Sequence, residues 1–246
     1  MKRNIRQDYL SNTVQYAADL ADQIRNDPDP SAKSESLIIL RNLLNQNPSP
    51  KIAASYARGL FVMAFCDPDT DAKREYLADL HQLLDQYPCR PVAVWYEFCL
   101  FNMSGFDPDM NLKRKYMSDL RQVLEQYPNQ EAAVDYARGL FNMIIFDPDA
   151  DAKRRYLADL QRAVIQYPCQ ETAACYACDL LAYACFCSDS NQKRNCLDEF
   201  RFMLKKYPVR DEVAGWVSDW APNTDIERDV RNRAVRILDE DGHVLH

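Results

Sequence analysis

The chain has 246 residues, of which 47% are hydrophobic and 27% are charged, and it contains 5 glycines against 14 tyrosines. This composition is typical of a globular protein and argues against disorder and against a turn-rich β fold. Thirty basic and 37 acidic residues give a formal net charge of −7, which disfavours nucleic acid as a partner because phosphate groups would be repelled.

The N-terminal stretch MKRNIRQDYLSN is basic but is not followed by the apolar run of a signal peptide. No segment approaches the roughly 18 uninterrupted apolar residues of a membrane-spanning helix. We therefore expect a cytoplasmic protein with no membrane partner. The nine cysteines do not recur at a framework spacing, so we expect reduced thiols.

A unit of about 40 residues recurs along the chain. Residues 50–89 and 130–169 are identical at 24 of 40 aligned positions, which indicates duplication. A helix-ending dipeptide returns once in every unit, at Asn47-Pro48, Tyr87-Pro88, Tyr127-Pro128, Tyr167-Pro168 and Tyr207-Pro208. These markers predict a single domain over 1–246, made of five copies at about 10–48, 49–88, 89–128, 129–168 and 169–208.

The first helical segment of each copy, helix A, carries a tyrosine followed four residues later by a leucine. Residues four apart share one face of a helix, so the two columns predict a buried stripe. Gly59 and Gly139 lie inside this helix, where glycine is unfavourable, so we expect another helix to approach closely. The columns are Tyr16, Tyr56, Tyr96, Tyr136 and Tyr176, and Leu20, Leu60, Leu100, Leu140 and Leu180.

The second helical segment, helix B, is predicted to begin near Lys73 and its equivalents, with Leu77 and Leu80 starting its apolar stripe. An Asp-Pro-Asp sequence precedes helix B in copies one to four. It suits an aspartate N-cap with proline at the first helical position. We expect the Lys-Arg pair at 73–74 and its equivalents to be solvated and paired with aspartates three or four residues earlier.

Residues 209–239 are predicted to form a C-terminal cap. Trp216 continues the tyrosine column and Trp220 the leucine column. A last helix follows a capping-box sequence at 224–227. Its expected apolar face is Val230, Ala234, Ile237 and Leu238.

With the Tyr/Leu stripe, the helix B stripe and the closing proline, residues 12–239 resemble the tetratricopeptide-like superfamily of α-solenoids. Copies two and four read Tyr-Ala-Arg-Gly-Leu, which is similar to bacterial repeat proteins with a Tyr-Ala-Lys/Arg-Gly-Leu core, some of which sit beside toxin genes. The repeat unit of this chain is longer than the usual unit of that superfamily, which is roughly 34 residues. The 40-residue period and the Tyr/Leu stripes predict an all-α right-handed superhelix of antiparallel helix pairs. The resemblance implies that this superhelix binds a protein or peptide on a curved groove.

The aspartates of the Asp-Pro-Asp sequences have part of the spacing of a calcium loop. Asp67, Asp69 and Asp71 match the first three ligand positions of an EF-hand, but Ala72 and Ala78 stand where glycine and a bidentate glutamate are needed. Helix capping explains the aspartates better, and we predict no bound metal.

Cys175 and Cys178, with Cys185 and Cys187, form the one thiol cluster with ligand-like spacing. We favour a packing role for them, with metal binding or redox sensing as the alternative. Three histidines (His81, His243 and His246) and the lack of a Gly-rich phosphate loop predict no catalytic residue and no cofactor.

The candidate binding face is the set of helix A columns at 55, 58 and 62. A helical projection places these columns away from the Tyr/Leu stripe, and they vary between copies. Because large aromatics at such positions anchor interfaces, alanine at Trp95 and Phe98 should weaken binding and leave the melting temperature nearly unchanged. The predicted partner-binding residues are Arg58, Trp95, Phe98, Asn102, Asp135, Arg138 and Asn142.

These observations favour a scaffold or adaptor that binds a protein or peptide. A toxin-neutralising immunity or inhibitor protein is the first alternative, since an acidic surface suits a basic target. An enzyme with an unrecognised site is a remote one.

Overall fold

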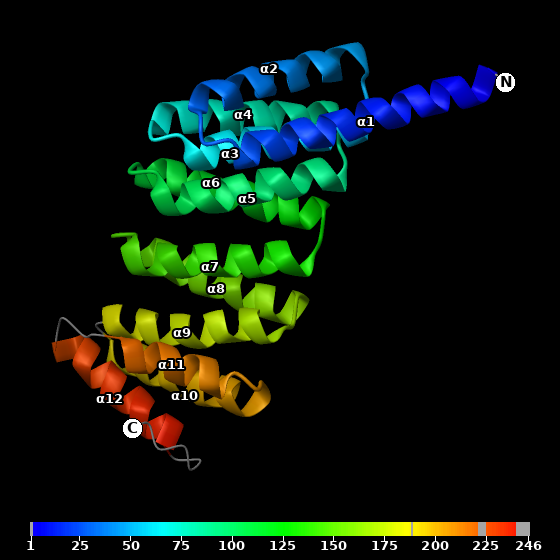
Figure 1. Cartoon of the computed structure of the whole chain (residues 1–246). Coiled ribbons are helices and arrows are strands. Elements are labelled where there is room, and N and C mark those ends of the chain that lie inside the picture. Colours follow the sequence, from blue (N-terminus) through cyan, green and yellow to red (C-terminus); the bar gives the residue numbers. More distant parts are fainter. Residues whose placement is uncertain (1, 188, 221–224, 240–246) are drawn as a thin grey trace. The chain divides into compact units, whose positions relative to one another are not determined.

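The computed structural model describes residues 2–187, 189–220 and 225–239, which are helical apart from short connections and contain no strand. The predicted all-α class is therefore confirmed, and the helices follow one another in consecutive packed pairs (Figure 1). The A helices are α1 (Lys2–Asn26), α3 (Pro50–Cys66), α5 (Arg90–Phe106), α7 (Gln130–Phe146) and α9 (Gln170–Phe186). The B helices are α2 (Pro30–Gln46), α4 (Thr70–Gln86), α6 (Met110–Gln126), α8 (Ala150–Gln166) and α10 (Ser190–Lys206), followed by α11 (Arg210–Asp219) and α12 (Asp225–Asp239).

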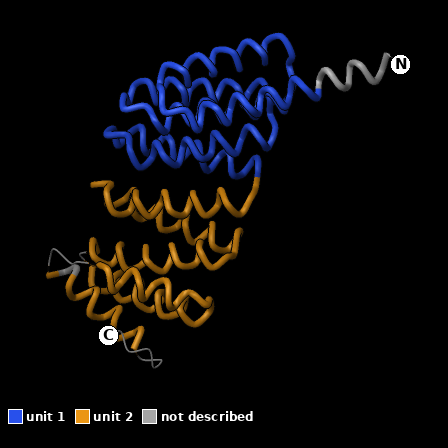
Figure 2. Tube along the Cα trace, viewed as in Figure 1, with its two compact units in different colours: residues 1–127 blue, residues 128–246 orange. Residues whose placement is uncertain are grey.

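The chain divides into two compact units, residues 1–127 and 128–246, at the end of the third predicted copy (Figure 2). In the first unit each A helix packs against the next one, so that α3 contacts both α1 and α5, while α2 and α4 each pack on the A helix of their own copy and of the following copy. In the second unit α9 contacts α7, α8 and α10, and the terminal helices α11 and α12 pack against it as well.

Aspartate capping sets where every helix B begins. The second aspartate of each Asp-Pro-Asp is the N-cap, and its side chain accepts a hydrogen bond from the backbone N–H two residues later, as in Asp69 with Asp71. Helix B therefore begins three residues before Lys73. The predicted place of proline is wrong here: Pro68 precedes the N-cap, because the first aspartate, Asp67, ends helix A and accepts from the Asp69 N–H. Proline does occupy the first helical turn at Pro30 and Pro50.

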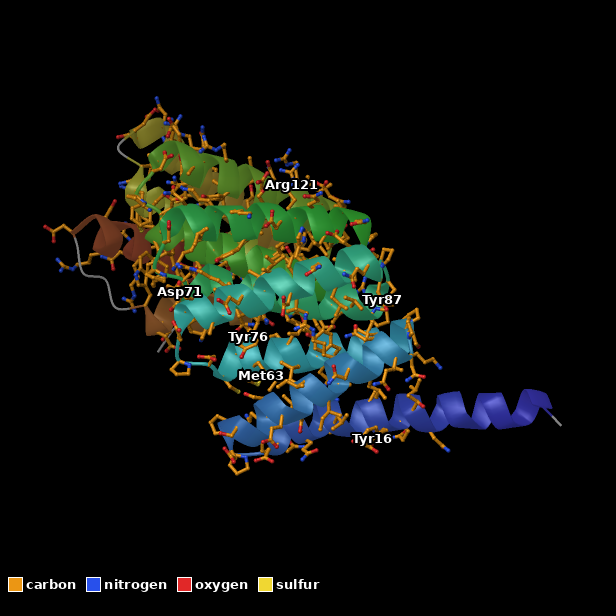
Figure 3. The ribbon with its side chains drawn as sticks, turned by 90° about the horizontal axis from the view of Figure 1, so that it is seen from above. Tyr16, Met63, Asp71, Tyr76, Tyr87 and Arg121 are labelled. Carbon is orange, nitrogen blue, oxygen red and sulfur yellow. The ribbon has the colours of Figure 1, made fainter. Side chains whose placement is uncertain are left out.

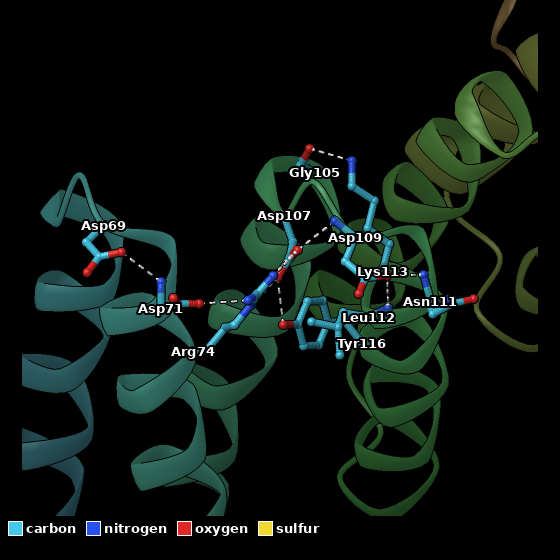
Figure 4. A network of polar contacts seen from close by, with 10 residues as sticks. All are labelled: Asp69, Asp71, Arg74, Gly105, Asp107, Asp109, Asn111, Leu112, Lys113 and Tyr116. Atoms are coloured by element: carbon cyan, nitrogen blue, oxygen red, sulfur yellow. Dashed lines mark hydrogen bonds and ion pairs between the residues drawn. The ribbon is translucent and has the colours of Figure 1, made fainter.

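A polar network joins copies two and three of the first unit (Figure 4). Asp107, which ends α5, is fully buried, and both of its carboxylate oxygens accept hydrogen bonds from the Arg74 guanidinium on α4, at 2.8 and 2.9 Å. The Tyr116 hydroxyl donates to the same carboxylate at 2.9 Å, and the Asp109 backbone N–H adds a fourth bond. The expected ion pair of Arg74 with Asp71 is also present at 2.8 Å. Arg74 thus holds successive copies together, which its sequence context did not suggest.

Burial alone would raise the pKa of Asp107, but the hydrogen bonds from Arg74, the Asp109 N–H and Tyr116 outweigh it and hold the pKa below the ordinary value. The carboxylate therefore remains charged inside the protein at neutral pH.

Gly59 confirms the expected close approach of helices. A Cβ atom at this position would lie 2.9 Å from a Leu37 methyl group and 3.0 Å from one of Ile24, closer than side chains tolerate. Glycine at this position of α3 lets α1 and α2 approach.

The predicted Tyr/Leu stripe is buried, with one exception. Tyr56, Tyr96, Tyr136 and Tyr176 are buried, whereas Tyr16 on α1 is 49% exposed (Figure 3). Tyr56 and Tyr96 each lie between two B helices of the first unit, and α2 is the first helix B in the described part of the chain. The stripe is thus completed by the neighbouring copy.

The C-terminal cap follows the prediction in part. Val230, Ala234, Ile237 and Leu238 form the buried face of α12. Trp220, however, ends α11 as its C-cap and does not extend a leucine column, because α11 has 10 residues where the other A helices after α1 have 17. The capping box at 224–227 lies partly outside the described residues. None of the described helices combines the length and apolar character that crossing a bilayer requires.

Replacing Arg74 with alanine should clearly lower the free energy of unfolding at pH 7, because the buried Asp107 carboxylate loses its charged donor. Urea denaturation measures this. The ordinary aspartate pKa is 3.8 and the folded one is lower, so this stabilisation is complete above pH 3.8 and disappears as the pH falls through the folded value. Arg121→Ala, which removes an exposed pair with Glu125, should change stability little. Equal effects of the two substitutions would contradict the assigned role of Arg74.

Candidate functional site

The predicted face on the A helices does not point wholly to solvent. Val62 and Asp135, from its variable columns, are buried, as are Cys178 and Ala182 of the fifth copy. Trp95, Phe98 and Asn102 are half-buried. The helical projection treated the Tyr/Leu stripe as the only buried face of helix A. Adjacent A helices also pack on each other, so these columns border the seam between copies.

Four aromatic rings form a cluster across the seam between α3 and α5. Phe61 is at its centre, with ring centroids 5.4 Å from Trp95, 6.0 Å from Phe98 and 6.1 Å from Phe65. Trp95 and Phe98 are themselves 5.9 Å apart. Two of the predicted anchors therefore come together, and they pack on a residue that the prediction missed. The signal was available, because phenylalanine recurs at 61, 101 and 141 directly after the leucine column.

A small apolar pocket opens beside the aromatic cluster, and we call it the α3–α5 pocket. Two of the rings that line it, Phe65 and Phe106, are 57% and 67% exposed. The Lys73 ammonium lies 5.6 Å from the centre of the Phe106 ring, and the Asn102 amide donates to the Phe98 carbonyl at 2.7 Å. The pocket is lined by Phe61, Ala64, Phe65, Lys73, Cys99, Asn102, Met103 and Phe106.

Arg58 serves the contact between copies one and two. Its guanidinium lies 2.6 Å from the Asp22 carboxylate on α1, and its side chain is largely covered. Arg58 therefore links α3 to α1, and it does not line the α3–α5 pocket.

The remaining predicted residues lie on α7, in the second unit. Asp135 is buried, and burial raises its pKa, with a smaller opposing effect from Arg138, whose guanidinium is 3.6 Å away. Arg138 is exposed and Asn142 is half-buried. On the same helix, Phe141 forms an edge-type contact with Trp216 of α11, with 5.8 Å between the ring centroids, so α7 also carries an aromatic contact.

Two grooves lined by equivalent positions of successive copies lie between neighbouring B helices of the first unit. The tyrosine of helix A borders each groove, beside an aspartate of its own helix B: Tyr56 with Asp79, and Tyr96 with Asp119. Burial first, and then the neighbouring aspartate, raises the pKa of both tyrosines. The opposite walls differ in charge, since one groove has Arg41 where the other has His81. Sequence reasoning treated the tyrosines as core residues and did not predict these grooves.

The cysteines and aspartates singled out by the sequence do not assemble into a cation site. Among the described residues, no three His, Cys, Asp or Glu side chains lie together in a way that could hold a metal ion. Burial raises the pKa of the Cys175 thiol to about 12, and that of Cys178 is raised for the same reason. These two thiols are protonated and unreactive at neutral pH.

Asp179 on α9 is fully buried, and neither of its carboxylate oxygens has a hydrogen-bond partner among the residues that the structure describes. Its column contains Gly59 in copy two, where an added side chain would meet the apolar groups of Ile24 and Leu37. Burial raises the pKa of Asp179 well above the ordinary value. The sequence signal is a carboxylate in a column that otherwise holds small residues in copies two to four.

Comparison of the chain with models of known protein families, with curated proteins and with solved structures finds no match.

The ring contacts of Trp95 predict that Trp95→Ala lowers the free energy of unfolding by about 2 kcal/mol, in place of the unchanged melting temperature expected for an outward-facing residue. Chemical denaturation followed by circular dichroism measures the change. Phe65→Ala, which truncates a mostly exposed ring, is the control and should cost clearly less. Equal stability of the wild type and Trp95→Ala would indicate that the Trp95 side chain faces outward, as the sequence analysis predicted.

Asp179→Ala should raise the free energy of unfolding at pH 7 by about 2 kcal/mol, because burying a carboxyl group without a partner is costly. The folded pKa is raised, so the stabilisation by this group is complete below pH 3.8 and is lost as pH rises toward the folded value. The advantage of the variant should therefore shrink on acidification from pH 7 to 4. The exposed Asp198→Ala is the control. A destabilised Asp179→Ala protein would indicate that the carboxylate has a partner.

Proposed function

We propose that the chain is a protein-binding helical repeat protein of the tetratricopeptide-like kind, and that its principal contact with a partner is the α3–α5 pocket. The observation that carries this proposal is the partly exposed aromatic cluster beside the pocket, together with the exposed Phe65 and Phe106 rings that line the pocket. Exposed aromatic side chains grouped at one place are the usual anchors of protein interfaces.

The pocket favours one kind of partner segment. Its walls are mostly aromatic and aliphatic and its volume is about 10 Å³, so a small apolar group of the partner would rest against its mouth and cover the Phe65 and Phe106 rings. Lys73 supplies a positive charge at the wall, which favours a carboxylate next to the apolar anchor. The proposed ligand is therefore a peptide segment with an apolar residue flanked by aspartate or glutamate.

Because the pocket lies between the A helices of two copies, its binding preference can differ from one pair of copies to the next. Among the columns that line it, the Phe65 column holds a different residue in every copy, whereas the Lys73 column and the Tyr/Leu columns remain constant. A duplicated scaffold can change the pocket at one seam without changing the stripe that holds the helices together.

Selection from a random peptide display library against the full chain tests this proposal. The enriched peptides should share an apolar residue beside an acidic one. Phe106→Ala should weaken their binding by about 2 kcal/mol, roughly 30-fold in Kd, and Lys73→Glu should weaken binding of the acidic peptides selectively.

Phe202→Ala is the matched control, since Phe202 on α10 is also about half exposed but lies outside the pocket. All three variants should retain the helical circular dichroism of the wild type. Peptides that bind the Phe106→Ala protein as well as the wild type would place the contact elsewhere. Failure to enrich any peptide over an unrelated protein would count against peptide binding itself.

A further inference from the structure

The two grooves between B helices of the first unit are lined by the same positions of successive copies. We call them the α2–α4 groove, which contains Arg41, and the α4–α6 groove, which contains His81 at the equivalent position. Each of the eight residues that line the α2–α4 groove has its counterpart 40 residues later in the α4–α6 groove, and five of the eight pairs are identical. The two grooves can therefore be compared position by position.

The differences between the grooves change their charge. Arg41 and Asp79 of the α2–α4 groove carry opposite charges, which cancel. The α4–α6 groove is lined by two aspartates, Asp85 and Asp119, and among the described residues that line it there is neither lysine nor arginine. With His81 counted as neutral, its lining has a charge of −2. The three pairs that differ are Arg41 and His81, Asn45 and Asp85, and Leu83 and Val123.

The α4–α6 groove is also the larger of the two, with a volume of about 290 Å³ against about 130 Å³. The Asp119 carboxylate at its wall is half-buried, and no hydrogen bond or ion pair reaches it from the part of the chain that the structure describes. Burial raises the pKa of this carboxyl group, and the positive charges of Lys115 and His81 oppose the effect only in part. The groove thus offers space and negative charge to a group that the chain itself does not supply.

Aromatic rings and a second carboxylate complete the α4–α6 groove. The Tyr96 ring lies with its centroid 5.4 Å from that of the His81 ring. The His81 imidazole is 3.9 Å from the Asp85 carboxylate, which is too long for a hydrogen bond, so Asp85 can accept from another donor. A planar guanidinium suits these surroundings, because it stacks on aromatic rings and donates to carboxylates at the same time.

We propose that the α4–α6 groove binds an arginine side chain of a partner polypeptide, which takes the place that Arg41 has in the α2–α4 groove. The guanidinium donates charge-assisted hydrogen bonds to Asp119 and Asp85 from the two walls of the groove. Gln122 and Gln126, which are exposed and one turn apart on α6, also line the groove and pair with peptide groups beside the arginine. Free arginine fits less well, because the two aspartates repel its own carboxylate.

This groove is separate from the α3–α5 pocket. The two share no lining residue, and they attract opposite charges, since Lys73 lines the pocket and the two aspartates line the groove. A site for arginine can therefore exist whether or not the α3–α5 pocket binds peptides.

The test is a titration of the full chain, labelled with ¹³C in its leucine and valine methyl groups, with the tripeptide amide acetyl-Gly-Arg-Gly, followed by NMR. Leu84 and Val123 line the α4–α6 groove, and their methyl signals should shift in a saturable way. Leu44, the counterpart of Leu84 in the α2–α4 groove, is the internal control and should not respond. The same peptide with neutral citrulline in place of arginine should bind at least about tenfold more weakly, and free arginine should also bind more weakly than the peptide.

Asp119→Asn should weaken binding of the arginine peptide about tenfold. It should keep the circular dichroism spectrum of the wild type, since the carboxylate has no partner within the described chain to lose. Phe106→Ala, which alters the α3–α5 pocket, should bind the arginine peptide as the wild type does.

Exchange of the differing residues tests the comparison of the two grooves directly. The double variant His81→Arg, Asp85→Asn gives the α4–α6 groove the charges of the α2–α4 groove and should abolish binding. The reciprocal variant Arg41→His, Asn45→Asp should make the Leu44 methyl signals respond to the arginine peptide.

Three results would overturn the proposal. The first is the absence of any response of Leu84 and Val123 to the arginine peptide. The second is an equal response to the citrulline peptide, which would show that the positive charge is not recognised. The third is unchanged affinity of Asp119→Asn or of His81→Arg, Asp85→Asn, which would place the bound peptide outside the groove.

Discussion

Within each unit, the packing of one A helix against the A helix of the next copy is the contact on which the rest of the structure depends. In the first unit it brings Gly59 of α3 against Ile24 of α1, and together with Leu37 of the B helix α2 it leaves no room for a side chain there. It also places the flanks of these A helices between copies and not in water. The residues that vary between copies therefore take part in packing and are only partly exposed. The first tyrosine of the series, Tyr16, shows what happens where a second helix B is missing, since half of its surface is exposed.

Much of the fold could be predicted from the period alone. A constant repeat length, with proline and aspartate at fixed places, determines two helices per copy, and the Tyr/Leu columns identify the buried face. The limits of this reasoning are physical. Helix B begins three residues earlier in the chain than predicted. The reason is that the aspartate before the proline ends helix A, while the aspartate after the proline is the N-cap of helix B. Trp220 does not continue the leucine column of the A helices, because α11 is short and ends before it.

The candidate site was predictable only in part, because a helical projection gives a direction and not a neighbour. It brought Trp95, Phe98 and Asn102 to one region, but it could not show that Phe61 of the preceding copy lies against Trp95. Contacts between copies are better traced by comparing columns one copy apart. Lys73 with Phe106, Arg74 with Asp107 and Lys153 with Phe186 are each separated by the same interval in the sequence, and this spacing marks the junction between one helix B and the next helix A.

The equal length of the helices and of their connections has a consequence for how such a chain can change through evolution. From α2 to α10 every helix has 17 residues, and the short connections between them are equal in length as well. A gain or loss of one whole unit at the gene level would therefore leave the rotational phase of all other helices intact, and it would alter only the contacts at the new junction. Arrays with fewer or more units, carrying the same local chemistry in a different order, are accessible by single recombination events between the similar segments 50–89 and 130–169.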